Sequence, residues 1–177
     1  SRLVITCQND GAKPNDIENI LSSKGGMLFL TVLINGNGGN TGNNGPKENS
    51  VTIPGISRKV LTVGSWDDNV TETGNSGRLT KNYSGSGPTE CCIVKPEVLA
   101  PGTNVKSCSK DAKGYVVKSG TSMAAPVVSG AVALAYQKHP DYTPAEMKLK
   151  LYESVYPRGE QIGRKCWGML HVNNLVV

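Results

Sequence analysis

Residues 120–130 read Gly-Thr-Ser-Met-Ala-Ala-Pro-Val-Val-Ser-Gly, and this stretch decides the fold. A short polar turn opens directly into a run of alanine and valine that predicts a helix, with Ser122 at its N-terminus. Unpaired backbone N–H groups and the positive end of the helix dipole lie at such a position. They suit a serine that must carry an oxyanion beside it during acyl transfer.

The alternative interpretation of this stretch is that Ser122 or Thr121 only caps a helix, as both residue types often do. A cap accounts for one hydroxyl group. It does not account for the glycine before the turn, the two alanines after it, or the proline placed early in the helix.

Outside this stretch the chain predicts alternating strands and helices. Continuous apolar runs are typical of parallel strands covered on both faces, and they indicate strands at Leu3 to Thr6, Met27 to Ile34 and Val60 to Gly64. Helices are predicted at Asp16 to Ser23, Ser122 to His139, and from Thr143-Pro144 to Val155; Lys95 to Gly102 is predicted extended and Thr71 to Lys81 a surface hairpin. The helix from Ser122 is apolar nearly all round and should be buried. The strand–helix–strand order at the start implies a right-handed βαβ unit and a parallel sheet.

The composition narrows the class of protein. The 177 residues suffice for one domain, and the 21 glycines are typical of a loop-rich α/β protein. The net charge of +5 comes from scattered Lys and Arg without a dense basic run, so we expect no nucleic-acid partner. No apolar run approaches the roughly 20 residues of a membrane span, so we expect no such span.

The sequence predicts neither a metal site nor a cofactor. Its five cysteines are odd in number and show no Cys-x-x-Cys spacing, which argues against a fully paired disulfide framework and against zinc. The adjacent Cys91 and Cys92 are interpreted as free thiols. Asp67 and Asp68 are neighbours in a turn, but two carboxylates are too few for a calcium site.

The run at 120–130 resembles the nucleophile signature of the subtilisin-like serine peptidases, the subtilases. Segments from about Gly26 onward are similar to further motifs of that family, at 42–47, 53–64, 83–88, 95–102 and 166–172. The resemblance implies an α/β fold, a doubly wound parallel sheet with helices on both faces. Residues 1–177 would then be the C-terminal portion of a single subtilisin-like peptidase domain whose N-terminal part is missing.

The resemblance also implies a function. The chain would be a serine endopeptidase that hydrolyses peptide bonds in protein or peptide substrates through an acyl-enzyme on Ser122. Gly120 and Thr121 would shape the turn that presents this nucleophile. A secreted or cell-surface location is what the family favours.

In the subtilases an Asn side chain in a Gly-Asn loop donates a hydrogen bond to the oxyanion, beside the N–H of the nucleophile. The corresponding loop here is Asn35 to Gly45. The local sequence Gly-Asn-Asn-Gly-Pro-Lys at 42–47 resembles the Gly-Asn loop of the family and favours Asn43. The distance from the end of the preceding strand favours Asn37 or Asn35, and both remain alternatives.

The Asp and His partners of such a serine are missing from this chain. The chain order of the subtilisin triad is Asp, His, Ser. The only histidines are His139 and His171, both after Ser122 and both interpreted as structural or solvated. Asp10, in Asn-Asp-Gly, is interpreted as a turn residue. We therefore expect an upstream segment or partner chain that carries Asp and His. The alternatives are an inactive fragment and a pseudoprotease that binds extended peptides.

Overall fold

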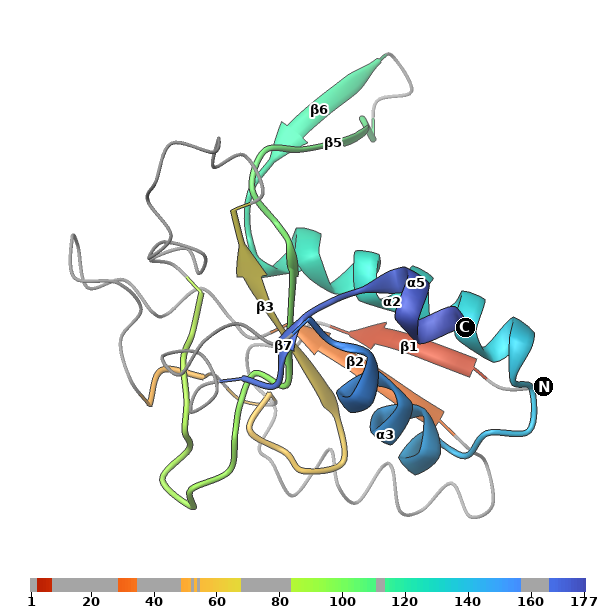
Figure 1. Ribbon diagram of the computed structural model, residues 1–177. Coiled ribbons are helices and arrows are strands. Elements are labelled where there is room, and N and C mark those ends of the chain that lie inside the picture. The colour runs from red at the N-terminus through yellow and green to blue at the C-terminus, as the bar shows by residue number, and fades with distance from the viewer. Residues whose placement is uncertain are drawn as a thin grey trace.

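A five-stranded parallel sheet forms the centre of the fold (Figure 1). The computed structural model describes residues 3–7, 29–34, 49–51, 53, 55–67, 84–110, 114–156 and 166–177. The strand order is β1-β2-β3-β4-β7. The strands span Leu3–Cys7 (β1), Phe29–Ile34 (β2), Leu61–Trp66 (β3), Val98–Pro101 (β4) and Gly168–Met169 (β7).

Every neighbouring pair in this sheet runs parallel. The register places Ile34 opposite Val63 and Trp66 opposite Pro101. The carboxyl ends of β2, β3 and β4 therefore meet at one edge of the sheet, which is where open α/β sheets carry their sites. The α/β class, the parallel sheet and the predicted strands are confirmed, with β3 ending two residues later than expected.

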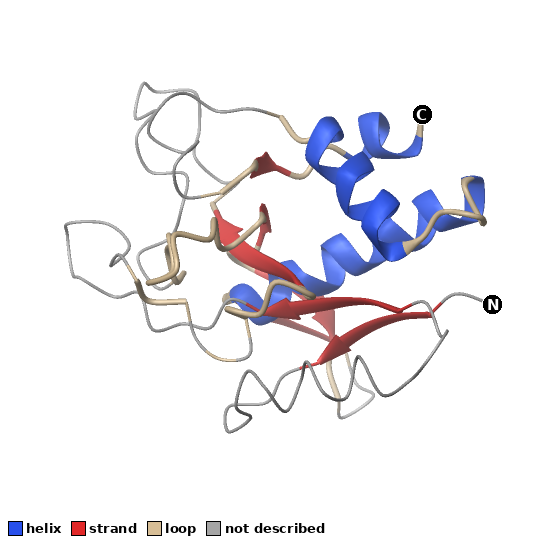
Figure 2. Ribbon diagram, turned by 90° about the horizontal axis from the view of Figure 1, so that it is seen from below, coloured by secondary structure: helices blue, strands red, loops and turns tan. Residues whose placement is uncertain are grey.

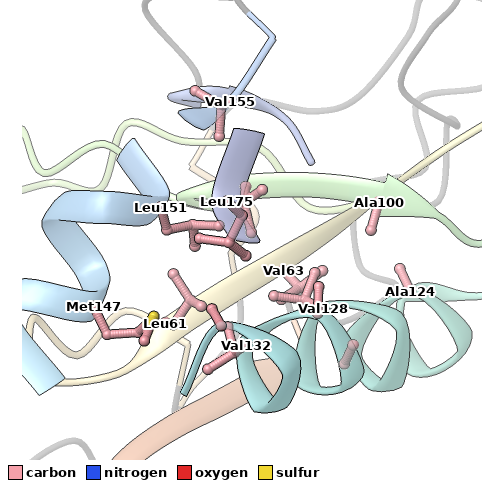
Figure 3. Packing of buried hydrophobic residues seen from close by; sticks show 14 of the residues in the cluster. Leu61, Val63, Ala100, Ala124, Val128, Val132, Met147, Leu151, Val155 and Leu175 are labelled. Atoms are coloured by element: carbon pink, nitrogen blue, oxygen red, sulfur yellow. The ribbon is translucent and has the colours of Figure 1, made fainter. Parts of the chain in front are cut away.

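Three helices pack together against one face of the sheet (Figure 2). They are α2 (Thr121–Lys138), α3 (Pro144–Ser154) and α5 (Val172–Val176). Side chains from all three meet β3 and β4 in one buried cluster (Figure 3), which includes Leu61, Val63, Val98, Ala100, Val128, Val132, Met147, Leu151 and Leu175. Burial of this apolar surface is the main force that holds the helices to the sheet.

The predicted positions of α2 and α3 are confirmed to within one residue at each end. The capping box of α3 is present: Thr143 Oγ1 accepts from the N–H of Glu146, and Glu146 Oε2 accepts from the N–H of Thr143 at 2.6 Å. The expectation that α2 is buried all round is wrong, because Leu134 on its outer side is 53% exposed. An apolar composition rich in alanine does not by itself distinguish the packed face from the solvent face.

A smaller apolar cluster contains Leu99, which points away from the helical cluster because side chains alternate along β4. It packs with Cys166 and Met169 and against Trp66. Burial raises the pKa of the Cys166 thiol to about 12, which marks Cys166 as an inert core residue rather than a reactive one.

The helix predicted at Asp16 to Ser23 and the hairpin predicted at Thr71 to Lys81 lie outside the described residues.

A hairpin that the sequence did not predict projects from the body of the molecule (Figure 1). Its strands are β5 (Val105–Cys108) and β6 (Tyr115–Lys118), which pair antiparallel. It connects the end of β4 to the start of α2. The short helix α5 was likewise not predicted, because five residues give too little periodicity to reveal a helix.

A buried group of charges joins the amino ends of β3 and β4. Lys95 is fully buried, and its Nζ lies 2.6 Å from Glu97 Oε1 and donates to the carbonyl of Val60 at 3.0 Å. Lys148 of α3 reaches the same Glu97 oxygen at 3.1 Å, and Glu97 Oε2 accepts from the N–H of Thr62 at 2.7 Å. Burial lowers the pKa of Lys95 to about 8 even though Glu97 opposes that shift.

We predict that Glu97→Gln destabilises the fold by about 3–5 kcal/mol at pH 7, because it leaves two lysines near a buried neutral amide. The cost should shrink as the pH rises through 8, since Lys95 then loses its charge and needs no counter-ion. Urea unfolding of the chain at pH 7 and pH 9.5 measures both effects.

The exposed Glu90 supplies the control, and Glu90→Gln should leave the free energy of unfolding within about 0.5 kcal/mol of its original value. The double variant Lys95→Met/Glu97→Gln should recover part of the loss, because the unpaired charge is then gone. A double variant as unstable as Glu97→Gln alone would contradict this account.

Candidate active site

Ser122 is the second residue of α2, as the sequence predicted. The N-cap is Gly120, with φ 154° and ψ 163°, and no side chain caps the helix. Residues with a Cβ rarely adopt this conformation, so glycine is required there. The interpretation of Ser122 or Thr121 as the N-cap is therefore wrong.

The turn before α2 is fastened to the carboxyl edge of the sheet. The N–H of Gly120 donates to the carbonyl of Gly102 at 2.8 Å, directly after β4. The N–H of Gly102 in turn donates to the carbonyl of Trp66 at the end of β3, at 3.3 Å. Thr103 Oγ1 approaches the same carbonyl at 3.4 Å. The start of the helix is thus fixed relative to both strand ends.

Gly102 allows this close approach because it has no side chain. A Cβ at this position would collide with Ser65 Oγ and would lie 2.8 Å from the carbonyl oxygen of Gly120. Ser65 itself is fixed, since its N–H donates to Ser84 Oγ at 3.1 Å. Gly102 was not predicted as part of the site, although it ends the segment 95–102 that resembles a subtilase motif.

A second contact ties the base of the hairpin to the same turn. The N–H of Asn104, just before β5, donates to Ser119 Oγ at 2.9 Å. Ser119 directly precedes Gly120, so both ends of the hairpin are joined at the nucleophile turn. Neither Asn104 nor Ser119 was predicted as part of the site, and their types alone give no signal that they would pair.

The electrostatics at the start of α2 favour negative charge. The first turn contains no acidic residue, while the basic Lys138 lies in the last turn. The N–H groups of the first turn have no intrahelical acceptor, apart from Met123, whose N–H donates to the carbonyl of Gly120 at 3.0 Å. Pro126 has no N–H, so it cannot donate the helical hydrogen bond to the carbonyl of Ser122 four residues earlier.

Packing holds the predicted turn residues in place. Thr121, Ala124 and Ala125 are fully buried, and both alanines belong to the helical cluster. Ser122, in contrast, is only partly buried. The arrangement suits a side chain that must meet an external molecule while its backbone stays rigid.

The candidate oxyanion donors Asn43, Asn37 and Asn35 lie outside the described residues, and so does Asp10. The structure does describe Ile34, the residue that precedes Asn35. It ends β2 at the same edge of the sheet as the nucleophile turn.

Each of the two histidines lies at the end of a helix. His139 is the C-cap of α2, 17 residues after Ser122, a separation of roughly 25 Å along a helix axis. His171 is the N-cap of α5, where its Nδ1 accepts from the N–H of Asn174 at 3.2 Å. Both geometries agree with the structural interpretation.

The described part of the chain shows no group of three or more His, Cys, Asp or Glu side chains placed to hold a metal ion. Of the two neighbouring aspartates considered as calcium ligands, Asp67 belongs to the described residues and Asp68 lies outside them. None of the described helices is long and apolar enough to cross a membrane.

The chain is similar in sequence to proteases of the subtilase family. The model of the subtilase family matches residues 8–169 of the chain. Serine protease AprX of Bacillus subtilis (strain 168) is 39% identical over 120 residues, which cover 60% of this chain and 27% of AprX. Subtilisin-like protease SBT3.4 of Arabidopsis thaliana is 38% identical over 96 residues, which cover 49% of this chain and 12% of that protein.

Solved structures share the fold. The prenylagaramide maturation protease PagA superposes with a TM-score of 0.70 at 22% identity and covers 98% of this chain. The self-cleaved protease domain of PatA gives a TM-score of 0.64 at 25% identity and covers 96% of it. The chain spans 60% and 55% of these two structures, and a smaller share of the curated relatives.

We predict that Gly102→Ala displaces the nucleophile turn, because the new Cβ must push Ser65 or the carbonyl of Gly120 away. The chain should lose about 1–3 kcal/mol of unfolding free energy, the usual cost of overpacking. The matched control is Gly130→Ala, where a Cβ meets nothing within 4 Å inside α2. This change should stabilise the chain by about 0.5–1 kcal/mol. Urea denaturation measures both, and equal effects of the two substitutions would contradict the close approach described here.

Proposed function

Because the chain belongs to the subtilase family, we propose that it supplies the nucleophile and the oxyanion site of a serine endopeptidase. The substrate class is proteins or peptides bound in an extended conformation. The observation that carries the proposal is the position of Ser122, at an uncapped helix start that is fastened to the carboxyl ends of β3 and β4.

In the proposed reaction Ser122 Oγ attacks the carbonyl carbon of the scissile peptide bond while a base removes its proton. The carbonyl oxygen becomes negatively charged and accepts a hydrogen bond from the N–H of Ser122. The C–N bond then breaks, the amine leaves with the proton, and an acyl group remains on Ser122. Water then attacks the acyl carbon while the base removes one of its protons. The bond between this carbon and Ser122 Oγ breaks, Oγ takes the proton back from the base, and the product leaves as a carboxylic acid.

The second oxyanion donor is the side chain of an asparagine in the loop that follows β2. We propose Asn43, with Asn37 and Asn35 as alternatives. Support comes from the topology, because β2 ends at Ile34 on the edge of the sheet where the nucleophile turn lies. A loop that begins at that edge is suitably placed to return an amide group to the start of α2.

The base and its aspartate come from outside this chain in the proposed enzyme. His139 is too distant from Ser122, and His171 is engaged at the start of α5. Among the described strands, β1 is an edge strand of five residues without charge or proline, whereas the opposite edge strand β7 has only two residues. Long uncharged edges invite a further strand, so the β1 edge is a suitable place for an upstream segment to join the sheet.

An inactive fragment or a pseudoprotease that binds extended peptides is the alternative. The observation that favours it is the number of histidines, since the sequence has only two: His139 lies at the far end of α2 from Ser122, and His171 accepts a hydrogen bond at the start of α5. Such a protein would keep the peptide-binding edge and the anion-favouring helix start without cutting its ligand.

We predict that a fluorophosphonate probe does not label the 177-residue chain but labels Ser122 once the upstream sequence is joined to it or added in trans. Phosphonylation needs the base, because the serine hydroxyl is a poor nucleophile without it. Mass spectrometry of the labelled peptide locates the modification, and Ser122→Ala is the control that removes it. Labelling of the chain alone would contradict the external base, and absence of labelling in both cases would favour the pseudoprotease.

We also predict that one substitution among Asn43→Ala, Asn37→Ala and Asn35→Ala lowers kcat of the completed enzyme roughly 10²–10³-fold, a magnitude established on subtilisin itself. KM should change little, because the hydrogen bond forms in the transition state. The other two substitutions serve as matched controls in the same loop. Equal, small effects of all three would contradict an asparagine donor from this loop.

A further inference from the structure

The β5–β6 hairpin has one face that is exposed and against which no other described strand or helix packs. In its antiparallel register Lys106 lies opposite Val117, and Cys108 lies opposite Tyr115. Cross-strand partners share a face, and side chains alternate along a strand, so these four residues form one surface, here called the Tyr115 face. All four are exposed, with Tyr115 at 70% and Val117 at 57%.

This exposure is unusual for residues of a hairpin. A two-stranded ribbon is marginally stable in water, and an aromatic ring and a valine held side by side gain little when solvent surrounds them. Within this face Lys106 Nζ lies 4.8 Å from the centre of the Tyr115 ring, a cation–π contact. Aromatic rings, especially tyrosine, are enriched in protein-binding surfaces.

The charge of the hairpin indicates the sign of its partner. From Thr103 to Ser119 the sequence contains four lysines and one aspartate, a net charge of +3. Among the described residues of this segment the charged ones are Lys106, Lys110 and Lys118, all of them exposed. A complementary partner is therefore acidic.

The hairpin is also a direct extension of the nucleophile turn. Lys118 ends β6 only four residues before Ser122, so their Cα atoms are at most about 14 Å apart. The hydrogen bond from Asn104 to Ser119 closes the base of the hairpin beside Gly120. The base of the hairpin is therefore close enough to Ser122 for residues that flank a scissile bond there to reach it.

From these observations we propose that the Tyr115 face binds an acidic segment of the protein substrate that flanks the scissile bond. Lys106 would pair with a carboxylate of that segment, while Tyr115 and Val117 would contact an apolar neighbour. This inference rests on the proposed function for the nature of the partner, and its test uses binding rather than cleavage.

The test uses the chain with Ser122→Ala and two fluorescein-labelled peptides, one carrying Glu and Asp around an apolar centre, the other carrying Gln and Asn at the same positions. Fluorescence anisotropy at low salt should show the acidic peptide binding roughly tenfold more tightly, as two or three exposed charge pairs allow. The difference should fall at 1 M NaCl because the charges are screened.

Lys106→Glu should remove most of this preference. Lys118→Glu carries the same charge change on the opposite face of the hairpin and should have a smaller effect. The exposed Lys59, before β3 at the other end of the sheet, provides the distant control, and Lys59→Glu should leave both affinities unchanged. Tyr115→Ala should weaken both peptides equally, and its high exposure means that the chain still folds.

Equal binding of the two peptides, or no binding of either, would overturn the proposal. Equal losses for Lys106→Glu and Lys59→Glu would also overturn it. So would displacement of the acidic peptide by a single-stranded oligonucleotide of the same net charge, which would identify a general polyanion surface. Sedimentation of a dimer that Tyr115→Ala dissociates would assign the face to a second copy instead.

These outcomes are separable from those of the peptidase proposal. A lost peptide preference with intact labelling of Ser122 in the completed enzyme removes only the hairpin proposal. A retained preference without any labelling removes only the peptidase proposal.

Discussion

The hydrogen bond from Gly120 to Gly102 is the contact on which the candidate site depends. It places the start of α2 against the end of β4, and it requires two glycines for different reasons: a Cβ at Gly102 would lie 2.8 Å from the carbonyl oxygen of Gly120, and Gly120 has a φ of 154° that other residues rarely adopt. Ser122 follows Gly120 by two residues, so this contact determines where the backbone of Ser122 lies. The site is thus a property of two glycines and the sheet edge, and the serine is the group that they present.

The opposite ends of β3 and β4 are held in a different way. There a fully buried Lys95, a nearly buried Glu97 and Lys148 of α3 replace the apolar contacts that fill the middle of the strands. The lowered pKa of Lys95 shows that desolvation exceeds the attraction of Glu97, so the group fixes geometry more than it adds stability. By bonding Val60, Thr62 and Glu97 together, these charges set the register in which β3 and β4 reach the nucleophile turn.

Much of this arrangement was predictable from the sequence because it rests on local signals. The apolar runs predicted β1, β2 and β3, the capping box predicted α3, and the run at 120–130 predicted a helix with Ser122 at its start. The partly exposed outer side of α2 was not predictable, since apolar residues occur on both the face that packs on the sheet and the face that meets solvent. The contacts of Gly102 with Gly120, of Ser65 with Ser84 and of Lys95 with Val60 were also hidden, because each joins residues 18 or more positions apart along the chain. The hairpin was missed for a third reason: its exposed strands lack the alternation of apolar and polar residues that burial imposes.

Together these features divide the work of the proposed enzyme between two pieces of polypeptide. The part described here fixes the nucleophile and an anion-favouring helix start without help from a base. In subtilisin, catalysis of roughly 10³–10⁴-fold over water remains when the triad is removed, and it comes from the oxyanion site and substrate binding. A segment that brings His and Asp to this chain would therefore meet a partly ordered site, and its binding energy would be needed only to position the base. Among the described strands β1 ends the sheet to whose carboxyl edge the nucleophile turn is hydrogen-bonded, so a strand added beside β1 would connect the base to Ser122 through rigid elements rather than through loops.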